Sequence, residues 1–183
     1  MLKPLSIYLI PLCCLLVPLT GRAQLYSVNN GTIQFRSDAK LELIKANSNE
    51  LRGKLDAAKK IFAFTVKMNS FKGFNSPLQK EHFNENYLES SRYPDATFSG
   101  KIIEDIDFNI DGNYTIRTKG NLTVHGISQE RIIKSDVNVH KGIITIVSNF
   151  TVQLSDHGIP IPKIVHEKLA SEIKVEVKAA MQQ

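Results

Sequence analysis

The chain has 183 residues with 23 Lys and Arg against 18 Asp and Glu, which gives a formal net charge of +5 at pH 7. This basic excess is small and is not gathered into clusters, so the composition excludes a nucleic-acid-binding protein. The length suits a single domain that can bury its own hydrophobic core.

Residues 1–23 are typical of a secretory signal peptide. Lys3 precedes an apolar run over residues 5–19, and Gly21-Arg22-Ala23 forms a small-x-small cleavage site before Gln24. We therefore predict that residues 1–23 direct export and are then removed.

Two other interpretations of this segment are less consistent with its residues. A membrane anchor would need about 20 apolar residues, whereas this run is shorter and contains Pro11 and Pro18. A lipoprotein would carry a small residue before the modified cysteine, but Leu12 precedes Cys13. We expect no stable membrane anchor after cleavage.

Cleavage would leave residues 24–183 as one domain. The loss of Lys3 and Arg22 leaves 21 basic and 18 acidic residues, a net charge of +3, and Cys13 and Cys14 are the only cysteines in the chain. The mature protein would therefore have no disulfide, no thiol nucleophile and no Cys-bound metal. Its stability would depend on its hydrophobic core.

The first part of this domain alternates apolar and polar residues, as strands do. We predict strands over residues 26–35, 40–46, 50–56 and 61–68, with polar turns at residues 36–38 and 47–49. The clearest apolar face belongs to the fourth of these strands and consists of Phe62, Phe64, Val66 and Met68.

Residues 81–101 interrupt the strands. Phe83, Tyr87 and Leu88 fall on one broad helical stripe. Pro94 lacks a backbone donor and biases the residue before it away from helical dihedrals. We predict a short helix that lies across an end or a seam of the sheet, ends at this proline and leads into the next strand.

Strands then continue to the C-terminus. Residues 98–108 keep one apolar parity with a bend near Asp105, and further strands are predicted over residues 114–124, 127–139, 143–154 and 173–178. Turn signals separate them at Asp111-Gly112, His125-Gly126 and Lys141-Gly142, and residues 163–171 are predicted to form a turn or two of helix.

The succession predicts a mainly β fold: a single antiparallel β-barrel of about eight strands with one or two short helices. Closure removes the exposed edges of long alternating strands, and a barrel of this size is either packed or wide enough for one small ligand. Four small residues on inward faces favour a cavity, although glycine also marks bulges and corners. They are Gly100, Thr118, Gly120 and Ser148.

Three motifs in a fixed order carry a family resemblance. They are Phe-Thr-Val-Lys-Met-Asn-Ser-Phe at residues 64–71, Phe-x-x-x-Tyr-Leu-x-x-x-x-Tyr-Pro-x-Ala-Thr-Phe-x-Gly-x-Ile at residues 83–102 and Leu-Thr-Val-His-Gly at residues 122–126. Together they resemble the YceI-like family of secreted bacterial proteins, over nearly all of residues 24–183. The chain has no tryptophan, so it lacks the Gly-x-Trp motif of true lipocalins and resembles those in architecture only.

The resemblance implies a lipocalin-like barrel with a helix, a periplasmic or secreted protein, and a polyisoprenoid or other long-chain apolar lipid bound inside the barrel. Each methylene of such a lipid that leaves water would contribute about 0.8 kcal/mol before entropic costs. We predict a lipid-binding set, of which any single member could equally be ordinary core. The set is Phe62, Phe64, Val66, Met68, Phe83, Tyr87, Leu88, Phe98, Ile102, Ile116, Leu122, Val124, Ile146, Phe150 and Val152.

No catalytic residue or metal ligand is predicted. Ser155, Asp156 and His157 are the residue types of a hydrolytic triad, but three adjacent residues do not generally form its geometry, and no Gly-x-Ser-x-Gly elbow is present. The histidines lack the spacing of metal ligands. His125 is instead predicted to hydrogen-bond the backbone at its turn.

Two functions remain open. The favoured one is a non-catalytic lipid binder, with no cofactor beyond an isoprenoid or isoprenoid quinone held as the ligand. The alternative is a secreted enzyme, or a quinone-associated accessory or stress factor, whose packed barrel is only a scaffold. A homodimer is compatible with either function.

Overall fold

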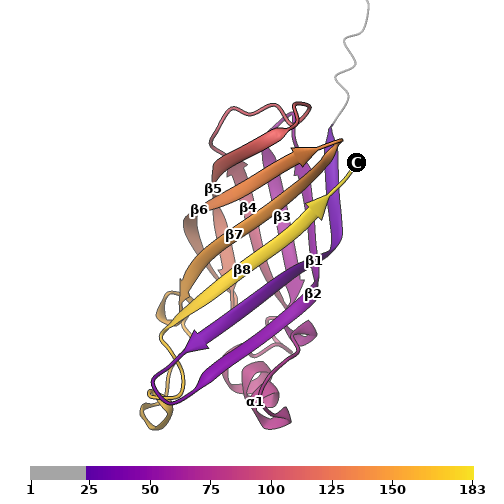
Figure 1. The fold of residues 1–183 in the computed structure, drawn as a ribbon. Helices are drawn as coiled ribbons and strands as arrows, with labels where there is room; N and C mark the ends of the chain where they lie inside the picture. The colour runs from indigo at the N-terminus through magenta and orange to yellow at the C-terminus, as the bar shows by residue number, and fades with distance from the viewer. Residues whose placement is uncertain (1–23) are drawn as a thin grey trace, which may run out of the picture.

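A computed structural model describes residues 24–183 as a closed eight-stranded antiparallel barrel (Figure 1). Every strand pairs with the next one along the chain, and β8 pairs with residues 32–36 of β1 to close the wall. The predicted fold class is confirmed. The strands are β1 Leu25–Asp38, β2 Leu43–Asp56, β3 Ile61–Lys67, β4 Asp95–Ile102, β5 Gly112–Val124, β6 Ile127–His140, β7 Ile143–Gln153 and β8 Glu172–Met181.

The predicted signal peptide lies outside the described residues. Within residues 24–183, no helix is both long and apolar enough to span a membrane.

The helical segment lies at one end of the barrel and differs from the prediction in its bounds. Helix α1 (Pro77–His82) begins before residue 81, because Ser76 caps it by accepting a hydrogen bond from the Gln79 N–H and Pro77 occupies the first turn. It continues into the π-helical turn η2 (Phe83–Tyr87). The helix ends at Tyr87 rather than at Pro94, and Glu89 then takes a positive φ of 45°.

The predicted turns at residues 36–38 and 47–49 were wrong, because both stretches lie inside strands. Ser37 is fully buried and its hydroxyl accepts from the Ala170 N–H, while Ser48 is buried against the Ser70 hydroxyl. These polar residues make distant hydrogen bonds rather than local turns. The true connection is residues 39–42, so two predicted strands merge into the long β2.

Three short 3₁₀ turns complete the fold: η1 (Met68–Ser70), η3 (Leu154–His157) and η4 (Lys163–Val165). The last of these is the helical turn predicted within residues 163–171. At the β5–β6 turn, His125 and Gly126 both have positive φ, as do Lys141 and Gly142 at the β6–β7 turn. Two consecutive residues with positive φ are the requirement of a tight two-residue hairpin.

A loop over residues 103–111 covers the barrel end opposite α1 (Figure 1). The predicted strand over residues 98–108 stops at Ile102, and Phe108 is buried at 3% exposure inside the barrel end. Glu104 anchors the loop by accepting from the backbone N–H and the side-chain Nε of Arg117, at 2.6 and 2.8 Å. These two hydrogen bonds, the side-chain one foremost, hold the pKa of Glu104 below its ordinary value.

Gly100 and Gly120 do not leave the unfilled volume that the sequence suggested. They face each other across β4 and β5, and a Cβ on Gly100 would lie 2.1 Å from the Lys119 carbonyl oxygen and 2.5 Å from the Gly120 Cα. The two glycines therefore permit a close approach of two backbones. Thr118 and Ser148, the other two small residues of that prediction, do line a cavity, which is described below.

We predict that Gly100→Ala lowers the free energy of unfolding by about 1–3 kcal/mol, because the new methyl group meets backbone atoms that cannot rotate away. Urea denaturation measures the change. Gly112→Ala is the matched control, since its Cβ would meet only the end of the Tyr114 side chain, at 3.2 Å. Equal stability of the two variants would contradict the close approach.

We also predict a pH-dependent role for Glu104. A carboxylate whose pKa is lowered in the folded state adds stability above its ordinary pKa of 4.5 and loses it as the pH falls through the lowered value. Glu104→Gln should therefore lower the melting temperature at pH 7 and have progressively less effect below pH 4.5. A difference from wild type that stays constant down to pH 3 would show that ionisation of Glu104 is unimportant.

Candidate functional site

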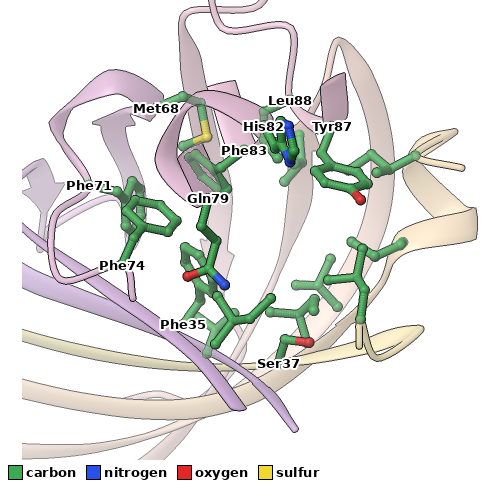
Figure 2. A pocket seen from close by; sticks show the side chains of 18 of the residues that line it. Phe35, Ser37, Met68, Phe71, Phe74, Gln79, His82, Phe83, Tyr87 and Leu88 are labelled. Carbon is green, nitrogen blue, oxygen red and sulfur yellow. The ribbon is translucent and has the colours of Figure 1, made fainter. Parts of the chain in front are cut away.

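The barrel contains a large apolar cavity at the α1 end, which we call the outer chamber. Its volume is about 460 Å³, and its walls come from the barrel strands, α1, η2 and the 154–169 segment. Figure 2 shows Phe35, Met68, Phe71, Phe83, Tyr87 and Leu88 around this space. The strands supply 12 of the 28 lining residues, since their inward side chains alternate with exposed ones, and the segments that cover this end of the barrel supply the rest.

Four phenylalanines form one side of the outer chamber. Phe83 of η2 stacks on Phe35 of β1, with ring centroids 5.3 Å apart and planes inclined by 12°. Phe71 and Phe74 pack against Phe83 at 5.8 and 5.1 Å. These contacts hold the helical segment over the barrel end, and aromatic pairs of this kind contribute about 0.5–1.5 kcal/mol beyond their buried area.

We call the part of the outer chamber that carries its charged and amide side chains the mouth. Gln79 of α1 donates to the Glu42 carboxylate at 2.9 Å, and Asn75 donates to the Leu43 carbonyl at 3.0 Å. Glu42, Gln79, His82 and Lys168 belong to the lining. The hydrogen bonds tie the helical segment to the β1–β2 connection, so the mouth is a defined opening rather than a loose flap.

A second, smaller cavity lies further along the barrel, and we call it the inner chamber. Its volume is about 110 Å³, and it extends toward Phe108 and Met181 at the closed end. Phe62 packs on Phe98 at 5.0 Å within its wall. The two chambers share five lining residues, which are Ile33, Val66, Ala96, Leu122 and Phe150. They are therefore adjacent compartments of one interior.

The structure places the whole predicted lipid-binding set on the interior. Nine members line the outer chamber: Val66, Met68, Phe83, Tyr87, Leu88, Leu122, Val124, Phe150 and Val152. The other six line the inner chamber: Phe62, Phe64, Phe98, Ile102, Ile116 and Ile146. Phe83 and Phe98 thus face the same barrel interior from two different chambers. Whether these residues contact a lipid stays a prediction.

Sequence reasoning missed much of the outer chamber. Ile33 and Phe35 share a parity within a predicted strand, so strand alternation could have identified them. Phe74 and Leu169 lie in irregular segments, where no periodicity marks an inward side chain. Ser37 was assigned to a turn, although it lies in β1 at the chamber wall.

Of the adjacent Ser155, Asp156 and His157, the last two bind separate partners on β6. The Asp156 carboxylate pairs with Arg131 at 2.8 Å, and the fully buried His157 ring donates from Nδ1 to the Ile127 carbonyl at 3.0 Å. The imidazole and the carboxylate therefore serve the packing of η3 against β6. In residues 24–183, no group of three or more His, Cys, Asp or Glu side chains is arranged to hold a metal ion.

Comparison with known proteins decides the family. The model of the YceI-like domain matches residues 23–181. The protein belongs to the YceI-like family. No significant match was found among curated protein sequences.

Solved structures share this YceI-like fold at low sequence identity. A polyisoprenoid-binding domain from Saccharophagus degradans has a TM-score of 0.73 and 12% identity, with 88% of this chain and 99% of that one covered. BcnA from Burkholderia cenocepacia has a TM-score of 0.68 and 14% identity, with 82% and 95% covered. A YceI protein from Campylobacter jejuni has a TM-score of 0.60 and 20% identity, with 75% and 84% covered.

Two motifs of this YceI-like chain meet in space and form what we call the His125 clasp. The Tyr93 ring lies against Gly126, where a Cβ would come within 2.4 Å of it, and meets the His125 ring edge-on at 4.8 Å. His125 donates from Nδ1 to the His157 carbonyl at 3.1 Å, and its Nε2 faces the Glu89 carboxylate at 3.2 Å. His125 therefore does bond a backbone carbonyl, but its partner lies in η3, so the prediction of a partner at the β5–β6 turn itself was wrong.

The clasp joins three segments that border the outer chamber: the end of η2, the β5–β6 turn and η3. We predict that His125→Ala lowers the free energy of unfolding by about 1–3 kcal/mol, because it leaves the carbonyl of the fully buried His157 without its donor. It should also speed amide hydrogen exchange over residues 83–93 and 154–159. His140→Ala is the control, since the His140–Asp111 pair is exposed. Unchanged exchange over these segments would contradict the clasp.

Proposed function

We propose that this YceI-like protein is a non-catalytic binder of a polyisoprenoid or another long-chain apolar lipid, held lengthwise in the barrel. The outer chamber of about 460 Å³, adjacent to the inner chamber of about 110 Å³, carries the proposal. A barrel that served only as a scaffold would be packed to the density of an ordinary core. An apolar interior of this volume instead favours a bound apolar ligand.

The energetics suit a long hydrocarbon chain. Burial of each methylene contributes about 0.8 kcal/mol, so a few isoprene units would offset the cost of ordering the ligand. The phenylalanines Phe35, Phe71, Phe74 and Phe83 offer flat apolar surfaces along one side of the path. The polyisoprenoid-binding domain from Saccharophagus degradans, which has the same fold, supports this class of ligand.

The surface around the mouth is also suited to a lipid that arrives from outside. Leu41 in the β1–β2 connection, Leu78 on α1 and Ile164 on η4 are exposed at 62%, 57% and 89%. These segments lie at the same end of the barrel in Figure 1. An apolar chain could thus move from one apolar surface to the next before it is fully enclosed.

The proposal includes export. The signal-peptide pattern of residues 1–23 and the absence of cysteine from residues 24–183 both suit a protein of the periplasm or the extracellular medium. A bound isoprenoid quinone would be cargo or ligand in this account, with no chemical step on the protein.

The proposal is tested first by what the protein carries. The mature protein, residues 24–183, is purified without added lipid, extracted with organic solvent and analysed by mass spectrometry, and it is then incubated with prenyl and fatty-acyl lipids. We expect a long-chain apolar lipid in the extract or stoichiometric uptake on incubation. An empty extract together with no uptake would reject the proposal.

A substitution at the junction of the two chambers tests the location of the lipid more directly than the extraction does. Phe150→Asp places a carboxylate on the wall that both chambers share, so it should weaken lipid uptake by more than about tenfold. Phe98→Asp should act in the same way in the inner chamber. Uptake is measured by displacement of a fluorescent fatty acid.

Two controls separate the interior from the surface. Asn149→Asp makes a similar change on the neighbouring exposed position of β7, and Lys174→Ala changes an outward side chain of β8. Both should bind as wild type does. If the Asp variants prove unstable, Phe150→Ala replaces them in the test. It keeps the wall apolar, so it should fold and retain part of the lipid uptake. Equal binding by all variants would show that the inward face is not the lipid site.

A further inference from the structure

The inner chamber contains a pair of serines whose hydrogen bonding is incomplete. Ser135 of β6 and Ser148 of β7 lie directly opposite each other, with hydroxyl oxygens 2.6 Å apart. Both are buried, at 5% and 7% exposure, and both line the inner chamber. Their cross-strand neighbours are apolar: Ile116 of β5 pairs with Ser135, and Val177 of β8 pairs with Ser148. The sheet itself therefore does not require a hydroxyl at either position.

A count of protons distinguishes this pair from the other buried serine pair. Each hydroxyl carries one proton. In the pair Ser48–Ser70, Ser70 donates to the Lys67 carbonyl, so Ser48 donates to Ser70, and both protons are used. Ser48 also accepts from the Glu50 N–H. That pair is complete and lines neither chamber.

In the pair Ser135–Ser148, one proton is shared between the two oxygens and one remains. Within residues 24–183, each of these two hydroxyls has the other serine as its only hydrogen-bond partner. The nearby Thr118 hydroxyl, also buried on this wall, donates its proton to the Ile133 carbonyl at 3.1 Å, so it is not free to bind a ligand. This serine pair thus presents one free O–H donor to the inner chamber. A buried donor without a partner is unfavourable, and a ligand oxygen would relieve this cost.

The rest of the inner chamber decides what kind of oxygen would fit. Its lining contains no Lys, Arg, His, Asp or Glu, whereas Glu42, His82 and Lys168 all belong to the outer chamber. A phosphate or carboxylate in the inner chamber would be a buried charge without a counter-charge. An alcohol or a carbonyl carries no such cost and accepts a hydrogen bond.

We propose that Ser135 and Ser148 form a subsite for the uncharged oxygen of the lipid, so that a polyisoprenoid alcohol or carbonyl compound binds with its oxygen-bearing end in the inner chamber and its chain through the outer chamber. This inference rests on the proposed lipid-binding function and adds the orientation and the chemical class of the ligand. A lipid with a diphosphate end would keep that end at the mouth, beside Lys168.

The test uses four probes that share one C20 prenyl chain: geranylgeraniol, geranylgeranial, the hydrocarbon that lacks the oxygen, and geranylgeranyl diphosphate. Affinities are measured for wild type and for the double variant Ser135→Ala/Ser148→Ala. We expect the double variant to bind the alcohol and the aldehyde about three- to tenfold more weakly, which corresponds to one hydrogen bond. Its affinity for the hydrocarbon and the diphosphate should not change.

Ser48→Ala is the matched control, because it removes a buried serine hydroxyl that lines neither chamber. It should bind all four probes as wild type does. The infrared carbonyl stretch of bound geranylgeranial gives a second readout. It should lie at a lower frequency in wild type than in the double variant, since a hydrogen bond weakens the C=O bond.

The outcomes separate the subsite from the function on which it rests. If the double variant loses affinity equally for the alcohol and the hydrocarbon, the serines act through packing and the subsite is rejected. If the affinity of the double variant for the alcohol equals that of wild type, the free serine O–H does not bond the ligand oxygen. The subsite is then rejected, while lipid binding stands. If wild type binds none of the four probes, the proposed function fails together with the subsite.

Discussion

The pairing of β8 with residues 32–36 of β1 is the interaction on which the interior depends, because it turns an open meander into a closed wall. Closure satisfies the backbone groups of both outer strands and fixes the diameter of the barrel. It also brings Ile33 and Phe35, which lie in the paired stretch, onto the wall of the outer chamber. The cavity is therefore held open by backbone hydrogen bonds around it, and it does not need side chains to fill it.

The two ends of the barrel are covered by different kinds of segment. At the closed end, Phe108 is inserted from a loop that Glu104 and Arg117 anchor. At the open end, η2 lies over the barrel through the contacts of Phe83, and the His125 clasp fixes the chain where it leaves η2. Two of the three family motifs, those of Tyr93 and His125, meet in that clasp, so their shared role is to define the border of the outer chamber. This explains why a histidine and a glycine are needed at a turn far from the cavity centre.

Strand parity predicted the interior well, because an alternating strand has only two faces and one must be buried. Each strand member of the predicted set, from Phe62 on β3 to Val152 on β7, lies on a chamber wall, and so do the members that helical spacing predicted. The errors occurred where tertiary contacts override local preference. Ser37 and Ser48 look like turn residues, yet their partners Ala170 and Ser70 are distant in sequence.

Phe74 could not be predicted for a related reason, because irregular backbone has no period from which to infer its direction. The role of Gly100 depends on Gly120 across the sheet, so neither residue alone shows whether the missing Cβ leaves a cavity or admits another backbone. The same limit applies to Ser135 and Ser148. Only the pairing register of β6 and β7 brings the two hydroxyls together, and this register cannot be read from the sequence.

The polar groups of the interior change in kind along the barrel. Charged side chains belong to the outer chamber at the mouth, and hydroxyl groups line the inner chamber. This gradient would admit an uncharged oxygen to the interior and keep a charged one at the mouth, because only the mouth offers solvent and counter-charges.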